Sequence, residues 1–283
     1  MLEFGYSPCP NDTFMFWAWA HSLLSSELAI QPQFHDIQQL NSLALSENPI
    51  ALTKISMATY LEPAVQKHYN LLSKGAALGR GCGPLLVSRQ PWSFENPTPL
   101  KIAIPGRNTT AFKLVQMALG PWVEEWVELR YDEIMPTVLK SQDLDAGLII
   151  HESRFIYQEI GLVCAFDLGA WWEEKTGLPL PLGVMVAHKS IPEDTIREVE
   201  SNLQQSITKA QDTLHLAKDS PESKSLWDYL RIHATELDDQ TILSHIELYV
   251  NEYSCELGRE GHAAIAEFEA RARRGTQHSN AVL

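Results

Sequence analysis

Short apolar segments alternate with amphipathic segments over the first two thirds of the chain. Apolar runs of strand length occur at Leu2–Tyr6, Ala29–Phe34, Ile50–Thr53, Tyr69–Ser73 and Leu85–Ser88. Segments of helical character separate them, at Thr13–Leu24, Gln38–Ser46 and Ser56–Gln66. This alternation predicts an α/β fold with a mainly parallel sheet that carries helices on its faces.

A proline-rich segment, Gln90–Pro99, interrupts the pattern, which then restarts. The second set of strand candidates is Lys101–Ile104, Val127–Leu129, Ala146–Ile150, Leu162–Phe166 and Gly183–Ala187. Only helical patterns follow beyond Ser190, beginning with apolar positions that recur every three or four residues from Ile196 to Leu214. Residues 190–193 match a capping box with a proline in the first turn, which would start this long helix.

The pattern predicts two lobes. We expect residues 1–90 and 190–283 to form a large α/β lobe, because a helical C-terminal segment in such a protein packs back on the first lobe. Residues 91–189 would form a small α/β lobe. The segments near Pro91–Pro99 and His188–Pro192 would be the hinge. Ligands of this architecture bind in a cleft between the lobes, at the carboxyl ends of strands.

Composition and charge narrow the classes of partner. The chain has 36 Asp and Glu residues against 22 Lys and Arg, a net charge of −14. Such an acidic protein is a poor partner for nucleic acid or for an anionic membrane surface. The apolar run Phe14–Ala20 is too short to cross a bilayer and follows no basic residue. We therefore expect no membrane insertion, no signal peptide and a cytoplasmic protein that binds a small molecule.

Cysteine and histidine spacing argues against a metal centre. The four cysteines (Cys9, Cys82, Cys164 and Cys255) lie far apart among apolar or small neighbours, which is typical of free and mostly buried thiols. The ten histidines include no pair with zinc-ligand spacing. The sequence thus predicts neither disulfides nor a metal site.

Two polar segments follow strand candidates of the first set. Ser7–Thr13 contains three residues of capping type, and capping of the next helix is the simpler interpretation, although Asn11 would remain available to a ligand. In the segment after Ile50–Thr53, Ser56 would place a hydroxyl at a helix start and toward a ligand. Lys54 is either a surface charge, which is the more common case, or a ligand contact.

The segment Gly106–Thr110 lies between a strand and a helix of the second set. Its hydroxyls, Thr109 and Thr110, together with the amides of a helix start, would suit a carboxylate or phosphate. N-capping by Asn108 or Thr109 explains the same residues equally well. The spacing is not that of a phosphate-binding P-loop.

The segment Gly147–Arg154 places a histidine directly after an apolar strand. His151 at that position could act as a general base, or it could be a hydrogen-bonded structural residue. Glu152 or Arg154 could orient it, or both could be solvent-exposed. A nucleophile elbow and a dinucleotide-binding glycine motif are both missing from the sequence, which argues against a serine hydrolase and against a nicotinamide or flavin enzyme.

Five motifs carry a resemblance to a known family. They are SPCPNDTFMF (Ser7–Phe16), ALTKISMATY (Ala51–Tyr60), GAALGRGCGPLLV (Gly75–Val87), IPGRNTTAF (Ile104–Phe112) and GLIIHESRF (Gly147–Phe155). Together they resemble the 1,4-dihydroxy-6-naphthoate synthases of the futalosine route to menaquinone. The resemblance runs from about Glu3 to the helices near Arg273, and its first and last motifs are specific in combination.

The resemblance implies a fold, a reaction and several residue roles. The fold would be like that of type II periplasmic binding proteins, with two lobes and a ligand cleft between them. The enzyme would be a carbon–carbon lyase that converts cyclic dehypoxanthinyl futalosine to 1,4-dihydroxy-6-naphthoate without a metal or organic cofactor. His151 would be the base, Thr109 and Thr110 would hold the substrate carboxylate, and Ser56 would contact the ligand.

Two other functions fit the same sequence. One is the reaction of the related chorismate dehydratases, which share the fold but differ at the first motif. The other is a non-catalytic small-molecule-binding protein. The expected absence of a signal peptide disfavours an exported binding protein, and turnover of the cyclic compound would separate all three.

Overall fold

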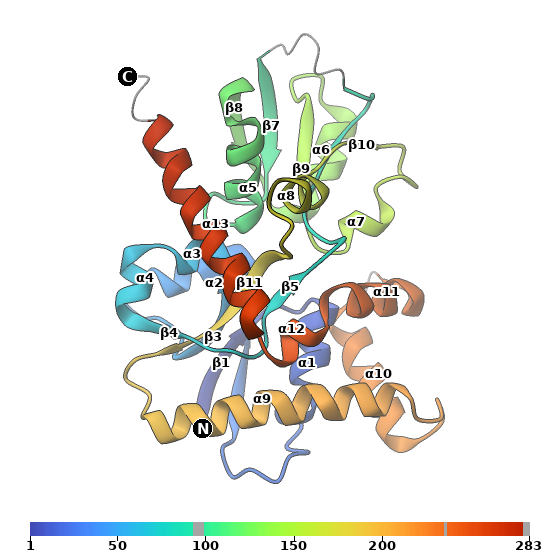
Figure 1. Cartoon of the computed structure of the whole chain (residues 1–283). Helices are drawn as coiled ribbons and strands as arrows, with labels where there is room; N and C mark the ends of the chain where they lie inside the picture. The colour runs from blue at the N-terminus through green and yellow to red at the C-terminus, as the bar shows by residue number, and fades with distance from the viewer. Residues whose placement is uncertain (93–98, 235–236, 280–283) are drawn as a thin grey trace. The chain divides into compact units, whose positions relative to one another are not determined.

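The computed structural model describes residues 1–92, 99–234 and 237–279 (Figure 1). The chain forms two compact units, each built around one sheet. The first unit contains Met1–Gly79 and Gly183–Gly261, and the second contains Arg80–Leu182 and the chain from His262 onward. The chain therefore passes between units three times, after Gly79, Leu182 and Gly261.

The sheet of the first unit has six strands: β1 (Leu2–Tyr6), β2 (Ile30–Phe34), β3 (Leu52–Ser56), β4 (Tyr69–Leu71), β5 (Ala77–Gly79) and β11 (Leu180–His188). Their order is β2-β1-β3-β11-β4, and β5 pairs with β11 off this path. Strand β1 runs parallel to β2 and β3, whereas β11 is antiparallel to β3 and β4. Strands β1 to β4 therefore run in one direction, as predicted, whereas β11, along which the chain returns from the second unit, runs in the opposite direction.

The helices of the first unit are α1 (Pro10–Ala20), α2 (Ile37–Ala44), α3 (Met57–Tyr60), α4 (Pro63–His68), α9 (Glu193–Leu214), α10 (Pro221–His233), α11 (Asp239–Tyr249) and α12 (Glu252–Cys255). Helix α1 is buried on almost every residue, and Phe14, Trp17 and Trp19 pack in one core with side chains of α9, α10 and α11. The apolar run that opens the chain is thus a central core helix. Among the described residues, each helix is either too short or too polar to span a lipid bilayer.

The sheet of the second unit has five strands, β6 (Leu85–Ser88), β7 (Leu100–Ile104), β8 (Val123–Glu128), β9 (Ala146–Ile149) and β10 (Val163–Asp167), in the order β10-β6-β9-β7-β8. Strand β7 is parallel to β8 and β9, and β6 is antiparallel to β9 and β10. The helices are α5 (Thr110–Leu119), α6 (Ile134–Lys140), α7 (Ser153–Ile156) and α8 (Leu168–Thr176), with 3₁₀ turns at Gly120–Trp122 and Tyr131–Glu133.

The last helix, α13 (Gly258–Ser279), begins in the first unit and continues in the second. The ring of Phe268 lies 5.6 Å from that of Trp172, and Arg271 Nη2 donates to the main-chain oxygen of Lys175 at 3.0 Å. The sequence assigned all of 190–283 to one lobe. That assignment differs from the structure, in which the part of α13 from His262 onward packs against α8 of the second unit. The hydrophobic pattern had not predicted α8.

Two further sequence expectations differ from the structure. Strands β6 and β7 flank the proline-rich segment and belong to one sheet, so this segment joins two strands of the second unit, and residues 93–98 lie outside the described chain. Helix α9 has Pro192 at its N-cap position and no side-chain cap. Ser190 instead shares a hydrogen bond of 2.7 Å with His188 Nδ1, so the predicted capping box was wrong.

None of the four cysteines forms a disulfide, and two of the four are not buried, contrary to the prediction from the sequence. Cys9 and Cys82 are buried, Cys255 is half-buried and Cys164 is exposed. Burial is the largest influence on the Cys82 thiol and raises its pKa to about 12, so this thiol stays protonated near neutral pH and is a poor nucleophile.

Candidate active site

The predicted site residues lie at one sheet edge in each unit. In the first unit β1 and β3 are parallel neighbours, so their carboxyl ends meet at the same edge, where Asn11 and Ser56 are found. In the second unit β7 and β9 are parallel neighbours, and the segments that follow them carry Thr109 and His151. Carboxyl ends of parallel strands are the usual place for ligand contacts in α/β proteins.

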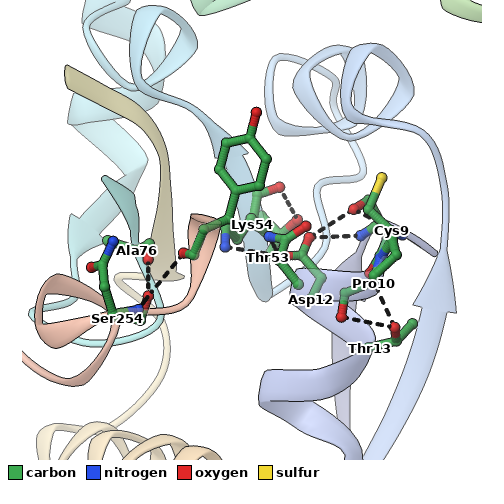
Figure 2. A network of polar contacts seen from close by, with 12 residues as sticks. Cys9, Pro10, Asp12, Thr13, Thr53, Lys54, Ala76 and Ser254 are labelled. Atoms are coloured by element: carbon green, nitrogen blue, oxygen red, sulfur yellow. Dashed lines mark hydrogen bonds and ion pairs between the residues drawn. The ribbon is translucent and has the colours of Figure 1, made fainter. Parts of the chain in front are cut away.

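Asp12 is the centre of the polar network at the first edge (Figure 2). Its side chain is buried, and its residue is only 2% exposed. Oδ1 accepts hydrogen bonds from Asn11 Nδ2 and Lys54 Nζ, both at 2.8 Å. Oδ2 accepts from the Ser7 main-chain N–H at 3.2 Å and from Ser7 Oγ at 2.8 Å. These four bonds occupy the acceptor capacity of a carboxylate.

Lys54 is a buried cation and not the surface charge that base rates favoured. Its residue is 2% exposed, its ammonium pairs with Asp12, and it lies 5.8 Å from the centre of the Phe16 ring. The aliphatic stem passes Gly183 on β11, where an added Cβ would lie 3.5 Å from Lys54 Cε. Strand β3 is buried along its whole length, so even its charged residue must find a partner inside.

The expected capping by residues 11–13 is not observed. Helix α1 begins at Pro10 with Cys9 in the N-cap position and no side-chain cap, so Asn11, Asp12 and Thr13 lie inside its first turn. The Thr13 hydroxyl donates to main-chain oxygens of the same turn. The simpler interpretation was therefore wrong, and Asn11 and Asp12 turn their side chains to each other instead.

Ser56 is held from both sides by an asparagine that the sequence did not point to. Asn41, a fully buried residue of α2, donates from Nδ2 to Ser56 Oγ at 2.9 Å. Its Oδ1 accepts the main-chain N–H of Ser56 at 2.8 Å. The Ser56 oxygen thus acts as an acceptor in the protein, and its own proton has no recorded acceptor among the described residues. A polar residue within the apolar face of α2 was the one available signal for Asn41.

Thr109 and Thr110 use their hydroxyl protons within the protein. Thr109 is the N-cap of α5: its Oγ1 accepts from the Phe112 N–H at 3.1 Å and donates to the Gly106 oxygen at 2.8 Å. Thr110 Oγ1 donates to the main-chain oxygen of Leu182 at 2.6 Å. Of the two candidate caps, Thr109 is the one observed. An anion at this helix start would meet main-chain N–H groups before it met a hydroxyl proton.

His151 has an unusual backbone conformation. Its φ is +56°, and among the described residues other than glycine only Ser22 also has a positive φ. A left-handed backbone costs an ordinary residue roughly 1 kcal/mol or more and often marks a functional position. The half-buried ring packs edge-on against Tyr131, with centroids 5.5 Å apart. The turn after β9 therefore directs this imidazole in a way that a regular helix start would not.

Arg154 links the turn of His151 to two neighbouring segments. Its main-chain N–H donates to the His151 oxygen at 3.4 Å. Its guanidinium donates to the main-chain oxygens of Gly83 at 2.8 Å and Gly81 at 3.2 Å, and to Asp167 Oδ2 at 3.3 Å. Of the two candidates for orienting His151, Arg154 is thus the one that ties the turn to its surroundings, whereas Glu152 occupies the N-cap position of α7 without a side-chain cap.

Asp167 extends this link to α8. Its other oxygen, Oδ1, accepts the main-chain N–H of Ala170 at 3.0 Å and caps that helix. The start of α8 lies so close to the loop at 81–83 that a Cβ on Gly169 would be 1.9 Å from the Cys82 oxygen. The second edge is therefore held by close main-chain contacts and one arginine.

Metal-ligating side chains do not gather at either edge. Within the described ranges no three His, Cys, Asp or Glu residues form a group that could hold a metal ion.

Comparison with known proteins identifies the family. A model of the menaquinone biosynthesis family matches residues 2–274. The 1,4-dihydroxy-6-naphthoate synthase of Thermus thermophilus is 45% identical over 271 residues, which cover 96% of this chain and 93% of that protein. The crystal structure of protein AF1704 from Archaeoglobus fulgidus has a TM-score of 0.86 at 30% identity and covers 98% of both chains.

A more distant structure defines the fold. The periplasmic aliphatic sulphonate binding protein SsuA of Escherichia coli gives a TM-score of 0.61 at 12% identity, covering 98% of this chain and 87% of that one. The fold is thus that of periplasmic binding proteins, as the sequence motifs implied. The match to the family model extends over nearly the whole chain, and the chain belongs to the menaquinone biosynthesis family.

Proposed function

We propose that this enzyme of menaquinone biosynthesis is a 1,4-dihydroxy-6-naphthoate synthase, a carbon–carbon lyase acting on cyclic dehypoxanthinyl futalosine. The name of the Thermus thermophilus relative supports the activity. The observation that carries the proposal is His151, which lies at the carboxyl edge of a sheet and has a left-handed backbone conformation.

The proposed reaction needs one base. A hydroxyl proton of the substrate passes to the neutral imidazole of His151, the carbon–carbon bond breaks, and the electron pair enters the ring that becomes aromatic. The products are an aromatic carboxylate and a sugar-derived fragment. Histidine suits this step because its neutral form is abundant near pH 7.

The substrate carboxylate would bind at the start of α5. Because both threonine hydroxyl protons go to main-chain oxygens, we assign the contact to main-chain amides in the first turn of α5 and not to the threonine side chains. Such a local site also explains how a chain with a net charge of −14 would hold an anion.

The first unit would add neutral polar contacts. The Ser56 hydroxyl would donate to a substrate oxygen, since Asn41 already donates to it and leaves its proton free to be used. Asn11 would offer its amide. Lys54 is too deeply buried to contact the substrate over a large area, so it would affect binding indirectly, through its ion pair with Asp12.

Turnover by the purified protein tests the proposal. Wild type should convert cyclic dehypoxanthinyl futalosine to 1,4-dihydroxy-6-naphthoate, and His151→Asn should lower kcat about 10²- to 10⁴-fold while binding changes little. Full activity in His151→Asn would exclude it as the base. Tight binding without product in the wild type would favour a binding protein, and dehydration of chorismate would favour the related enzyme.

A further inference from the structure

The Asp12–Lys54 ion pair is the most deeply buried pair of charges recorded in the described chain, with 3% of each side chain exposed. Placing two charges in an apolar core costs free energy that their attraction seldom recovers in full, so a buried pair is weak evidence for stability alone. The proposed chemistry uses neither charge directly.

The pair decides which end of the Asn11 amide faces the protein. A carboxylate can only accept hydrogen bonds, so Asn11 must turn its Nδ2 toward Asp12 Oδ1, at 2.8 Å. The amide is planar, and its oxygen then points away from the carboxylate. No hydrogen bond to Asn11 Oδ1 is recorded from the described residues, and the residue keeps 7% of its surface exposed.

The other contacts of Asp12 keep it from taking another orientation. Oδ2 is held by the main-chain N–H and the hydroxyl of Ser7, so Oδ1 must face Asn11 and Lys54. Lys54 supplies the positive charge that a buried carboxylate requires. The position of Lys54 is in turn fixed by strand β3 and by Gly183 of the neighbouring strand β11, which has no side chain and leaves room for the lysine stem.

We propose that the Asp12–Lys54 pair is a positioning device that makes Asn11 present its carbonyl oxygen to the ligand. The ligand group recognised at this edge is then a hydrogen-bond donor, such as a hydroxyl of an oxygen-rich small molecule. The proposal rests on the proposed function in one respect, namely that Asn11 contacts the substrate. Asp12 and Lys54 are positioning residues, and neither needs to touch the ligand.

The double exchange Asp12→Asn with Lys54→Met should reverse the amide. Once the Lys54 ammonium no longer needs an acceptor, the new asparagine keeps its oxygen toward the Ser7 N–H, so its NH₂ group faces Asn11. Asn11 then turns its own oxygen inward and presents its NH₂ group outward. Asn11 would then offer the ligand a hydrogen-bond donor in place of an acceptor, and its side chain would keep the same size.

Kinetics of charge-removed variants separate positioning from stability. Asp12→Asn and Lys54→Met should each lower Tm, because each leaves one buried charge unpaired, and the double variant should recover most of the loss. KM of the double variant should nevertheless stay about three- to tenfold above wild type, the loss expected for one hydrogen bond, while kcat changes less. A double variant with wild-type Tm and wild-type KM would overturn the proposal.

A matched control is the Lys74–Glu256 pair of the same unit. Its nitrogen–oxygen distance is also 2.8 Å, but 19% and 53% of the two side chains are exposed. The double variant Lys74→Met with Glu256→Gln should leave KM within about twofold of wild type, since exposed pairs contribute little. An equal rise of KM in this control would show a general loss of order and would contradict the positioning role.

Proton NMR tests the orientation without any turnover. In wild type one Nδ2 proton of Asn11 should exchange slowly with water, because it is bonded to a buried carboxylate, and in the double variant Asp12→Asn with Lys54→Met the pattern of protection should change. Rapid exchange of both protons in wild type would refute the orientation even if the enzyme is active. If wild type shows protection but no turnover of the cyclic compound, the proposed function fails and the positioning of Asn11 stands.

Discussion

The two sheet edges hold their polar side chains by different means. At the first edge a buried ion pair fixes Asn11 and Ser7 through side-chain hydrogen bonds. At the second edge the main chain fixes His151 through a left-handed turn, and Arg154 bonds mostly to main-chain oxygens around that turn. One edge is thus ordered by charge and the other by backbone shape.

This difference matches what each edge is proposed to do. A side chain that only recognises a ligand can be locked by a charged neighbour, because its protonation never changes. A general base must gain and lose a proton, and a fixed ionic partner on its ring would favour one state over the other. The structure positions His151 through the left-handed backbone of its turn.

The largest effect on the second edge, which is held by its main chain, is expected from Gly169→Ala. The added Cβ would lie 1.9 Å from the main-chain oxygen of Cys82, so the start of α8 would have to move away from the loop at 81–83. We expect a loss of at least about 2 kcal/mol in the free energy of unfolding, measured with denaturant. The loss should reach the second edge, because Asp167 caps α8 and also binds Arg154.

Gly120→Ala is the control for this substitution. Gly120 has a right-handed helical conformation, and no atom lies within 4 Å of an added Cβ. This variant should be neutral or slightly more stable, since alanine restricts the unfolded chain. If Gly169→Ala is as stable as Gly120→Ala, close main-chain packing does not hold the second edge.

Local sequence signals predicted much of the fold. The apolar runs Leu2–Tyr6 and Leu85–Ser88 are strands with those same bounds, because turn residues end each run abruptly. The site segments after β1, β7 and β9 were found for the same reason, since polar residues follow each buried strand. Features that depend on neighbours near in the chain were therefore accessible.

Features that depend on distant neighbours were not. Lys54 looks like any surface lysine until β3 is enclosed by its neighbouring strands and the charge meets Asp12. The left-handed conformation at His151 could not be predicted, because the residue there is neither glycine nor asparagine, the residues that usually adopt it.

Arg154→Lys should give a smaller effect that falls on catalysis. A lysine cannot bond to Gly81, Gly83 and Asp167 in the geometry of a planar guanidinium, so the turn of His151 would loosen. We expect kcat to fall about tenfold with a smaller change in KM, because a misplaced base affects the reacting geometry more than binding. Steady-state kinetics on the cyclic substrate would measure both.

Arg89→Lys is the matched control for that substitution. Arg89 also donates to three main-chain oxygens, those of Val138, Ser141 and Leu144, in the same unit. Both variants should lose stability to a similar degree, about 1–3 kcal/mol. A similar fall of kcat in both would mean that Arg154 acts only on stability. The claim that the second edge is ordered to position a catalytic base would then be wrong.

The smallest expected effect concerns Thr109. Thr109→Ala removes the side-chain cap of α5 and should cost about 1 kcal/mol in the free energy of unfolding, whereas Thr109→Ser keeps the cap and should cost little. Because the Thr109 hydroxyl proton goes to Gly106, the main-chain amides are expected to bind the carboxylate, and KM should change less than about threefold in either variant. A tenfold rise of KM in Thr109→Ala, with wild-type KM in Thr109→Ser, would instead assign the anion to the hydroxyl. The second edge would then recognise its ligand through a side chain, as the first edge is proposed to do.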